Sequence, residues 1–113
     1  MMQFSVLTKE GAAIVILEGE MVGGPDATLL SDQLHKLLQA DKKKIILDMA
    51  QINYMNSSGL GILIGGLTTV RNHGGDIKLL HLAPKLKELL RITKLDCVFD
   101  VFEKEEEAIG SFA

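Results

Sequence analysis

Two adjacent serines, Ser57 and Ser58, lie at the start of a segment rich in glycine and apolar residues, and residues 54–66 (YMNSSGLGILIGG) contain no charged side chain. Hydroxyl groups at a helix start often serve as N-caps, in which the oxygen accepts a hydrogen bond from a free N–H of the first turn and contributes about 1 kcal/mol. A phosphoryl group there would meet the same N–H groups and the positive end of the helix dipole. The pattern therefore allows capping by Asn56, Ser57 or Ser58, and it also allows a phosphorylated serine.

The glycines that follow the serines are too numerous to be explained by a cap. Gly59, Gly61, Gly65 and Gly66 within one helix cost roughly 3 to 4 kcal/mol relative to alanine. Glycine lets another backbone approach closely, so the helix either packs tightly on its own sheet or presents a bare surface to a partner. The sequence leaves both explanations open.

Catalytic motifs are not recognisable in the sequence. The glycine spacing misses the dinucleotide fingerprint by one residue, no glycine lies two positions before either serine, and there is no P-loop. His35, His73 and His81 are too scattered along the chain for a metal site, and His81 is expected to be a hydrogen-bonded residue at a strand end. We therefore expect no enzyme, no cofactor and no metal, and nucleotide binding at the glycine-rich edge is a less favoured alternative.

The composition indicates a single globular domain over residues 1–113, because 47% of the residues are hydrophobic, 24% are charged and only two are proline. Cys97, the single cysteine, is expected to be a small buried residue in a reducing compartment. The net charge is −3 and lysines 42–44 are the only basic cluster, which argues against a nucleic-acid partner. Because no signal peptide or long apolar stretch is recognisable, we expect a cytoplasmic protein without membrane insertion.

Hydrophobic periodicity predicts strands and helices that alternate after an N-terminal hairpin. Residues 4–7 and 12–17 are apolar strands separated by the turn-rich residues 8–11. A helix follows with Asp26 as its expected N-cap, and its apolar face carries Leu30, Leu34 and Leu37.

A strand–helix–strand unit comes next. Residues 45–47 are expected to form a strand covered on both faces, followed after Asp48 by an eight-residue connection. The apolar side of the following helix, which residues 74–75 end, is expected to contain Leu60, Leu63, Ile64, Leu67 and Val70. With a strand over 77–82, this unit should have a right-handed crossover and parallel strands.

The last third of the chain is predicted to contain a helix that begins near Pro84, a short strand over 98–102 and a terminal helix over 103–112. The apolar side of the first of these helices contains Leu86, Leu89 and Leu90.

Taken together, these segments resemble the STAS domain, and within it the anti-sigma factor antagonists of bacterial partner-switching systems. The resemblance covers nearly the whole chain, and its most specific part is the Ser-Ser-Gly-Leu-Gly core after a hydrophobic pair. The segments that carry it are LEGE at 17–20, ILD at 46–48, YMNSSGLG at 54–61, Gly75 before IKL at 77–79, LLRITKL at 89–95 and the Glu-rich end with Ala108. The resemblance implies an α/β fold, with a mixed sheet of four to five strands, formed by the hairpin and the βαβ unit and backed by about four helices.

The resemblance also implies a switch instead of an enzyme. In such antagonists, a serine kinase that is also the anti-sigma factor binds the unmodified protein and releases its sigma factor; phosphorylation ends the binding, and a serine phosphatase restores it. The kinase binds the ATP. Matched onto this chain, the phosphorylated residue is Ser58. The residues expected to contact the partner are Asn56, Ser57, Gly59, Leu60, Gly61, Gly23, Gly24 and Asp26.

One residue departs from the family pattern, because the family usually has Asp immediately before the two serines and this chain has Asn56. Asn can cap a helix but carries no charge. The alternative function is therefore a STAS scaffold that is not phosphorylated, such as an accessory subunit of a transporter or of a stress-signalling complex.

Overall fold

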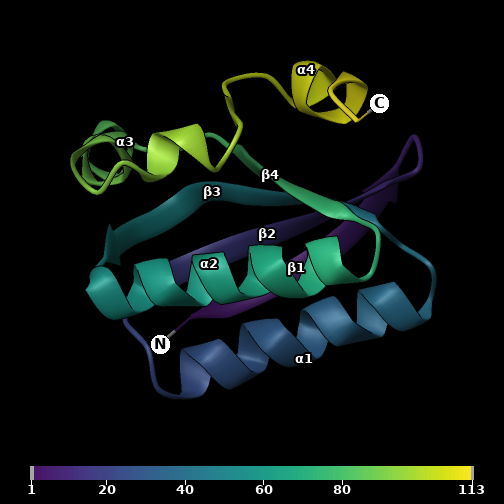
Figure 1. Cartoon of the computed structure of the whole chain (residues 1–113), viewed down its shortest axis with the longest axis horizontal. Coiled ribbons are helices and arrows are strands. Elements are labelled where there is room, and N and C mark those ends of the chain that lie inside the picture. The colour runs from purple at the N-terminus through teal and green to yellow at the C-terminus, as the bar shows by residue number, and fades with distance from the viewer. Residues whose placement is uncertain (1, 113) are drawn as a thin grey trace.

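In the computed structural model, which describes residues 2–112, one five-stranded sheet with the strand order β1-β2-β3-β4-β5 carries helices on its two faces (Figure 1). The strands are β1 Gln3–Lys9, β2 Ala12–Met21, β3 Lys44–Met55, β4 Asp76–Leu80 and β5 Val101–Phe102. The helices are α1 Pro25–Gln39, α2 Ser57–Asn72, α3 Pro84–Ile92 and α4 Glu105–Gly110, with a 3-10 turn over Leu95–Cys97. This mixed five-stranded sheet with four α-helices within the described range confirms the predicted α/β fold class.

The strand pairing follows the prediction of a hairpin and a βαβ unit. Strand β1 pairs with β2 in the antiparallel sense, and β2, β3, β4 and β5 are mutually parallel in sheet order. Glu10 and Gly11 connect β1 to β2 with φ angles of 51° and 83°. Two consecutive positive φ angles are typical of the tight turns whose twist matches a β-hairpin.

Strand β3 is longer than predicted. The residues after Asp48, expected as a connection, continue the strand to Met55, which pairs with Met21 of β2. The pairing shifts register twice, between Ile16 and Glu18 and between Gly19 and Glu20. Such irregularities break the alternation of buried and exposed residues on which a strand prediction depends, so this half of β3 did not look like a strand in the sequence.

Two apolar layers enclose the sheet. Helices α1, α2 and α3 contribute to the larger buried cluster on one face, and α4 contributes Ala108 to a smaller cluster on the other. Ile45, Ile46 and Leu47 are all fully buried, because alternate residues of β3 belong to the two clusters. The prediction of a strand covered on both faces is therefore confirmed.

Several local expectations were wrong. Cys97 is exposed in the 3-10 turn, and Phe99 is the buried residue of that segment. Ile64 is 39% exposed because it lies on the outer side of α2. The terminal elements are shorter than the predicted ranges because irregular backbone occupies residues 98–100 and 103–104. The expectation for His81 is confirmed, since it lies just beyond β4 with Nδ1 3.2 Å from an oxygen of Asp48.

A charged cluster lies on the α4 side of β4. Lys78 is 7% exposed, and its Nζ lies 2.6 Å from Asp100 and 3.3 Å from Asp76. Burial works against ionisation of Asp76, but hydrogen bonds from Arg71, from the backbone of Ile77 and from Lys78 outweigh it and hold the pKa of this carboxyl below its ordinary value of 3.8. The ionised form of Asp76 is therefore the one that the fold stabilises.

We predict that Asp76→Asn destabilises the domain at neutral pH and much less at pH 3. A carboxyl whose pKa is lowered by folding contributes stability above its ordinary pKa, and this contribution is lost as the pH falls through the lowered value. Urea unfolding at pH 7 and pH 3 measures the difference, with Asp32→Asn on the exposed side of α1 as the control. An equal loss of stability at both pH values would contradict the prediction.

Candidate functional site

Ser57 and Ser58 are the first two residues of α2, and both are exposed. They follow the carboxyl end of β3, and α1 begins beyond the carboxyl end of the neighbouring parallel strand β2. The two helices consequently start at the same edge of the sheet and run side by side (Figure 1). The positive ends of two helix dipoles therefore lie close to the serines.

Asn56 caps α2, which decides between the candidates that the sequence left open. Its Oδ1 accepts a hydrogen bond from the N–H of Gly59 at 2.9 Å, and its Nδ2 donates to the carbonyl oxygen of Val22 at 3.4 Å. The two serine hydroxyls are consequently not used as the N-cap. An aspartate at position 56 could accept from the helix but could not donate to the carbonyl group of Val22.

The loop after β2, which the resemblance implied as part of the partner-binding surface, lies directly against Ser58. Gly23 has a φ of 102°, and a Cβ atom placed on it would lie 3.1 Å from the Cβ of Ser58. Gly24 has a φ of 61° and occupies the N-cap position of α1. Side chains at these two positions would be strained, and at Gly23 the side chain would also crowd Ser58.

Asp26 has a different role from the two that were predicted. It lies inside the first turn of α1 and is only 4% exposed, so it neither caps the helix nor offers a surface to a partner. Its carboxylate accepts hydrogen bonds from the N–H of Met2 at 3.2 Å and from the N–H of Val22 at 3.3 Å. Asp26 therefore holds the start of the Gly23–Gly24 loop in place from the buried side of the loop.

The glycines of α2 divide into two groups, of which one packs tightly within the domain and the other is open at its surface. A Cβ atom on Gly59 would overlap the carbonyl oxygen of Met21, whereas Gly61 and Gly65 have nothing within 4 Å of that position. Gly59 is buried and the neighbouring Leu60 is 4% exposed. Gly59 and Leu60 were predicted to contact a partner, but their interior positions remove them from the surface.

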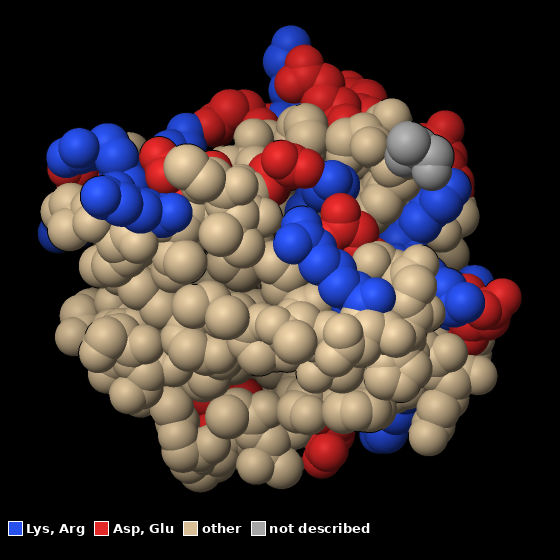
Figure 2. Space-filling view, in the orientation of Figure 1, with Lys and Arg blue, Asp and Glu red and all other residues tan. Residues whose placement is uncertain are grey.

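The outer side of α2 is an uncharged surface. Figure 2 shows that Lys, Arg, Asp and Glu are absent over most of this helix, whose residues carry no charge from Ser57 to Val70. Val22 follows β2, Tyr54 is the last residue but one of β3 and Ile64 lies in α2, and these residues are 39%, 51% and 39% exposed. These three residues were not among the predicted contact residues, although the uncharged segment 54–66 contains Tyr54 and Ile64.

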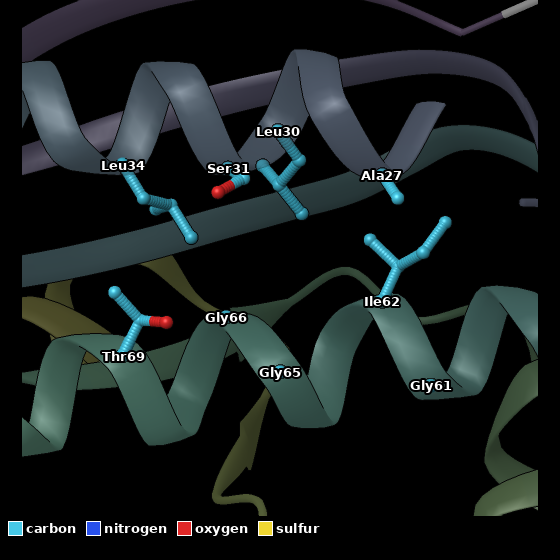
Figure 3. A pocket seen from close by; sticks show the side chains of 9 residues that line it. All are labelled: Ala27, Leu30, Ser31, Leu34, Gly61, Ile62, Gly65, Gly66 and Thr69. Carbon is cyan, nitrogen blue, oxygen red and sulfur yellow. The ribbon is translucent and has the colours of Figure 1, made fainter. Parts of the chain in front are cut away.

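A hollow of about 240 Å³ lies between α1 and α2. Figure 3 shows its walls, formed by Ala27, Leu30, Ser31 and Leu34 from α1 and by Gly61, Ile62, Gly65, Gly66 and Thr69 from α2. The exposed backbone of Gly61 and Gly65 therefore forms part of the wall of a shallow, mainly apolar depression between α1 and α2.

Comparison with known proteins supports the same kind of domain. The family model of the STAS domain matches residues 3–108. The chain is 24% identical over 109 residues to the anti-sigma F factor antagonist of Paenibacillus polymyxa, which covers 96% of this chain and 92% of that protein. It is 34% identical over 61 residues to the anti-sigma-B factor antagonist of Bacillus subtilis (strain 168), which covers 54% and 56%.

A solved structure has the same fold. The phosphorylated form of the Bacillus cell fate determinant SpoIIAA superposes with a TM-score of 0.71 and 19% identity, covering 98% of this chain and 100% of that chain. Within residues 2–112, none of the helices has the length and apolar character that a membrane span requires.

We predict opposite effects for alanine at two neighbouring glycines of α2. Gly59→Ala should destabilise the domain by about 3 kcal/mol, because its methyl group would overlap the backbone of Met21. Gly61→Ala should stabilise it by about 0.5–1 kcal/mol, because alanine restricts the unfolded chain and meets no neighbour. Urea unfolding of both variants measures the difference. If Gly61→Ala proved as destabilising as Gly59→Ala, the division of the glycines would be wrong.

Proposed function

Because the chain belongs to the STAS domain family, we propose that it is an anti-sigma factor antagonist switched by phosphorylation of Ser58. In the unmodified state it binds an anti-sigma factor that is also a serine kinase, and the sigma factor is released. Phosphorylation ends this binding, and a serine phosphatase restores it. The names of the relatives in Paenibacillus polymyxa and Bacillus subtilis support the antagonist role, and the phosphorylated SpoIIAA structure supports the modification.

The position of Ser58 is the observation that carries this proposal. Its hydroxyl is exposed and is not needed as the helix cap, because Asn56 provides the cap. At the start of a helix, the N–H groups of Ser57 and Ser58 have no carbonyl partner within the helix. A phosphoryl group on Ser58 could use these N–H groups and the adjacent helix dipoles without any change of fold.

The uncharged surface around Ser58 explains how one phosphate would end binding. The proposed contact surface consists of exposed or half-buried residues at the edge of the sheet and along α2: Val22, Gly23, Gly24, Tyr54, Asn56, Ser57, Ser58, Gly61 and Ile64. Phosphorylation adds about 1.5 to 2 negative charges and takes the formal net charge from −3 to roughly −5. A partner surface that accepts a neutral serine would have to bury this charge unpaired, which costs several kcal/mol.

The alternative function, a STAS scaffold that is never phosphorylated, is motivated by the uncharged Asn56 at the position where the family usually has Asp. The amide of Asn56 has a structural use of its own, since it donates to Val22 while capping α2. This use accounts for Asn without any loss of access to Ser58. Whether a cognate kinase phosphorylates the chain distinguishes the two functions.

We predict that the cognate anti-sigma factor kinase and ATP add one phosphate, at Ser58. Ser58→Ala should abolish the modification, whereas Ser57→Ala, the matched control one residue earlier, should leave much of it. Intact-mass measurement followed by peptide mapping locates the group. A phosphate on Ser57, Thr68 or Thr69 of the wild-type chain would refute the assignment, and an unmodified chain would support the scaffold function.

The same proteins test how the switch acts. Ser58→Ala should bind the kinase persistently, and Ser58→Asp should weaken binding only in part, because a carboxylate has less charge and bulk than a phosphate. Amide NMR shifts on phosphorylation should be confined to residues 56–61 and to the loop 23–26. Shifts throughout the sheet would indicate that a conformational change, and not local charge repulsion, ends the binding.

We predict that Gly61→Leu weakens kinase binding more than tenfold, equivalent to 1.4 kcal/mol, while the domain stays folded. Gly61 has nothing within 4 Å of its Cβ position, so a leucine would project from α2 into the space that a partner backbone would occupy. Gly110→Leu, at an equally open position in α4, is the control and should bind normally. Calorimetric titration with the kinase measures both, and unchanged affinity of the folded Gly61→Leu variant would remove α2 from the interface.

A further inference from the structure

His35 and His73 lie far apart in the sequence, but the fold brings them together. Their ring centroids are 6.3 Å apart, with an angle of 86° between the ring planes. Ser31 and Thr69, one turn earlier on α1 and α2, line the hollow between these helices (Figure 3). The two histidines therefore meet across the helix pair, toward its C-terminal end.

Backbone hydrogen bonds orient both rings in the same way. Nδ1 of His35 lies 2.8 Å from the carbonyl oxygen of Ser31, and Nδ1 of His73 lies 2.8 Å from that of Thr69. A carbonyl oxygen only accepts, so each Nδ1 carries the hydrogen and the neutral ring keeps its lone pair on Nε2. Metal-binding histidines are usually oriented by such a bond from the nitrogen that does not bind the metal.

We propose that Nε2 of His35 and Nε2 of His73 together bind one divalent transition-metal ion, of the class of Zn²⁺, Ni²⁺ or Cu²⁺. With Zn–N bonds of about 2.0–2.1 Å, two imidazole rings on one tetrahedral ion have centroids roughly 5 Å apart, so the two exposed rings would move about 1 Å closer than their observed separation of 6.3 Å when they bind the ion. In residues 2–112 no three His, Cys, Asp or Glu side chains gather as metal ligands, so water completes the coordination.

The ligand type selects this class of ion, whereas the surrounding field is mixed, because Lys36 and Arg71 in the last turns of α1 and α2 oppose the helix dipoles. His73 is the C-cap residue of α2 and His35 lies in the C-terminal half of α1, where helix dipoles favour positive charge. Imidazole nitrogen suits Zn²⁺, Ni²⁺ and Cu²⁺, whereas Mg²⁺ and Ca²⁺ prefer oxygen ligands. A bound ion would link the C-terminal parts of α1 and α2, the helices whose N-termini flank Ser58.

Calorimetric titration of the untagged, chelator-treated chain with NiCl₂ tests the site. We expect one ion per chain, and MgCl₂ should give no binding. His35→Gln and His73→Gln should each lower the Ni²⁺ affinity at least tenfold, and the double variant should bind little worse than either, because both ligands belong to one site. His81→Gln, which changes the third histidine beside Asp48, is the matched control and should bind like the wild type.

NMR of the wild-type chain provides a test that requires no variant. Addition of ZnCl₂ should shift the Nε2 resonances of His35 and His73 together, with saturation at one equivalent and without dimer formation in sedimentation. The proposal is overturned if the wild-type chain binds no Ni²⁺, if the single variants retain its affinity, if His81→Gln loses it, or if the ion joins two chains.

Discussion

The close approach of α2 to the end of β2 is the constraint on which the functional edge depends. A side chain on Gly59 would overlap the carbonyl oxygen of Met21, so the first turn of α2 can lie there only with glycine. This contact sets the position of α2 relative to the loop after β2. It allows Asn56 to reach Val22 and places Ser58 against Gly23.

Val22 shows how the edge is held together from two sides. Its N–H donates to the carboxylate of Asp26, and its carbonyl oxygen accepts from the amide of Asn56. The carboxylate of Asp26 in α1 thus binds the N–H of Val22, and the amide of Asn56 before α2 binds its carbonyl oxygen. A carboxylate at position 56 would place oxygen against oxygen, which gives a physical reason for asparagine in this chain.

The two sides of α2 meet different requirements. Its inner side needs Gly59, and at Gly66 a Cβ atom would lie 2.9 Å from a terminal methyl group of Leu34, which would have to shift. Its outer side, with Gly61 and Ile64, carries no charge, so the helix dipoles and the buried carboxylate of Asp26 contribute to the field near Ser58. A single phosphoryl group would therefore change the electrostatic character of this surface more than the same group would on a highly charged one.

Local pattern in the sequence determined the α/β class, the hairpin, the βαβ unit and the apolar sides of the helices, because periodicity and turn residues act over a few positions. The motif around Ser58 also indicated the family. Only the tertiary structure decided that Asn56 is the cap, that Asp26 is buried and that β3 extends to Met55. These features, like the pairing of His35 with His73, depend on contacts between segments far apart in the chain, which no local pattern records.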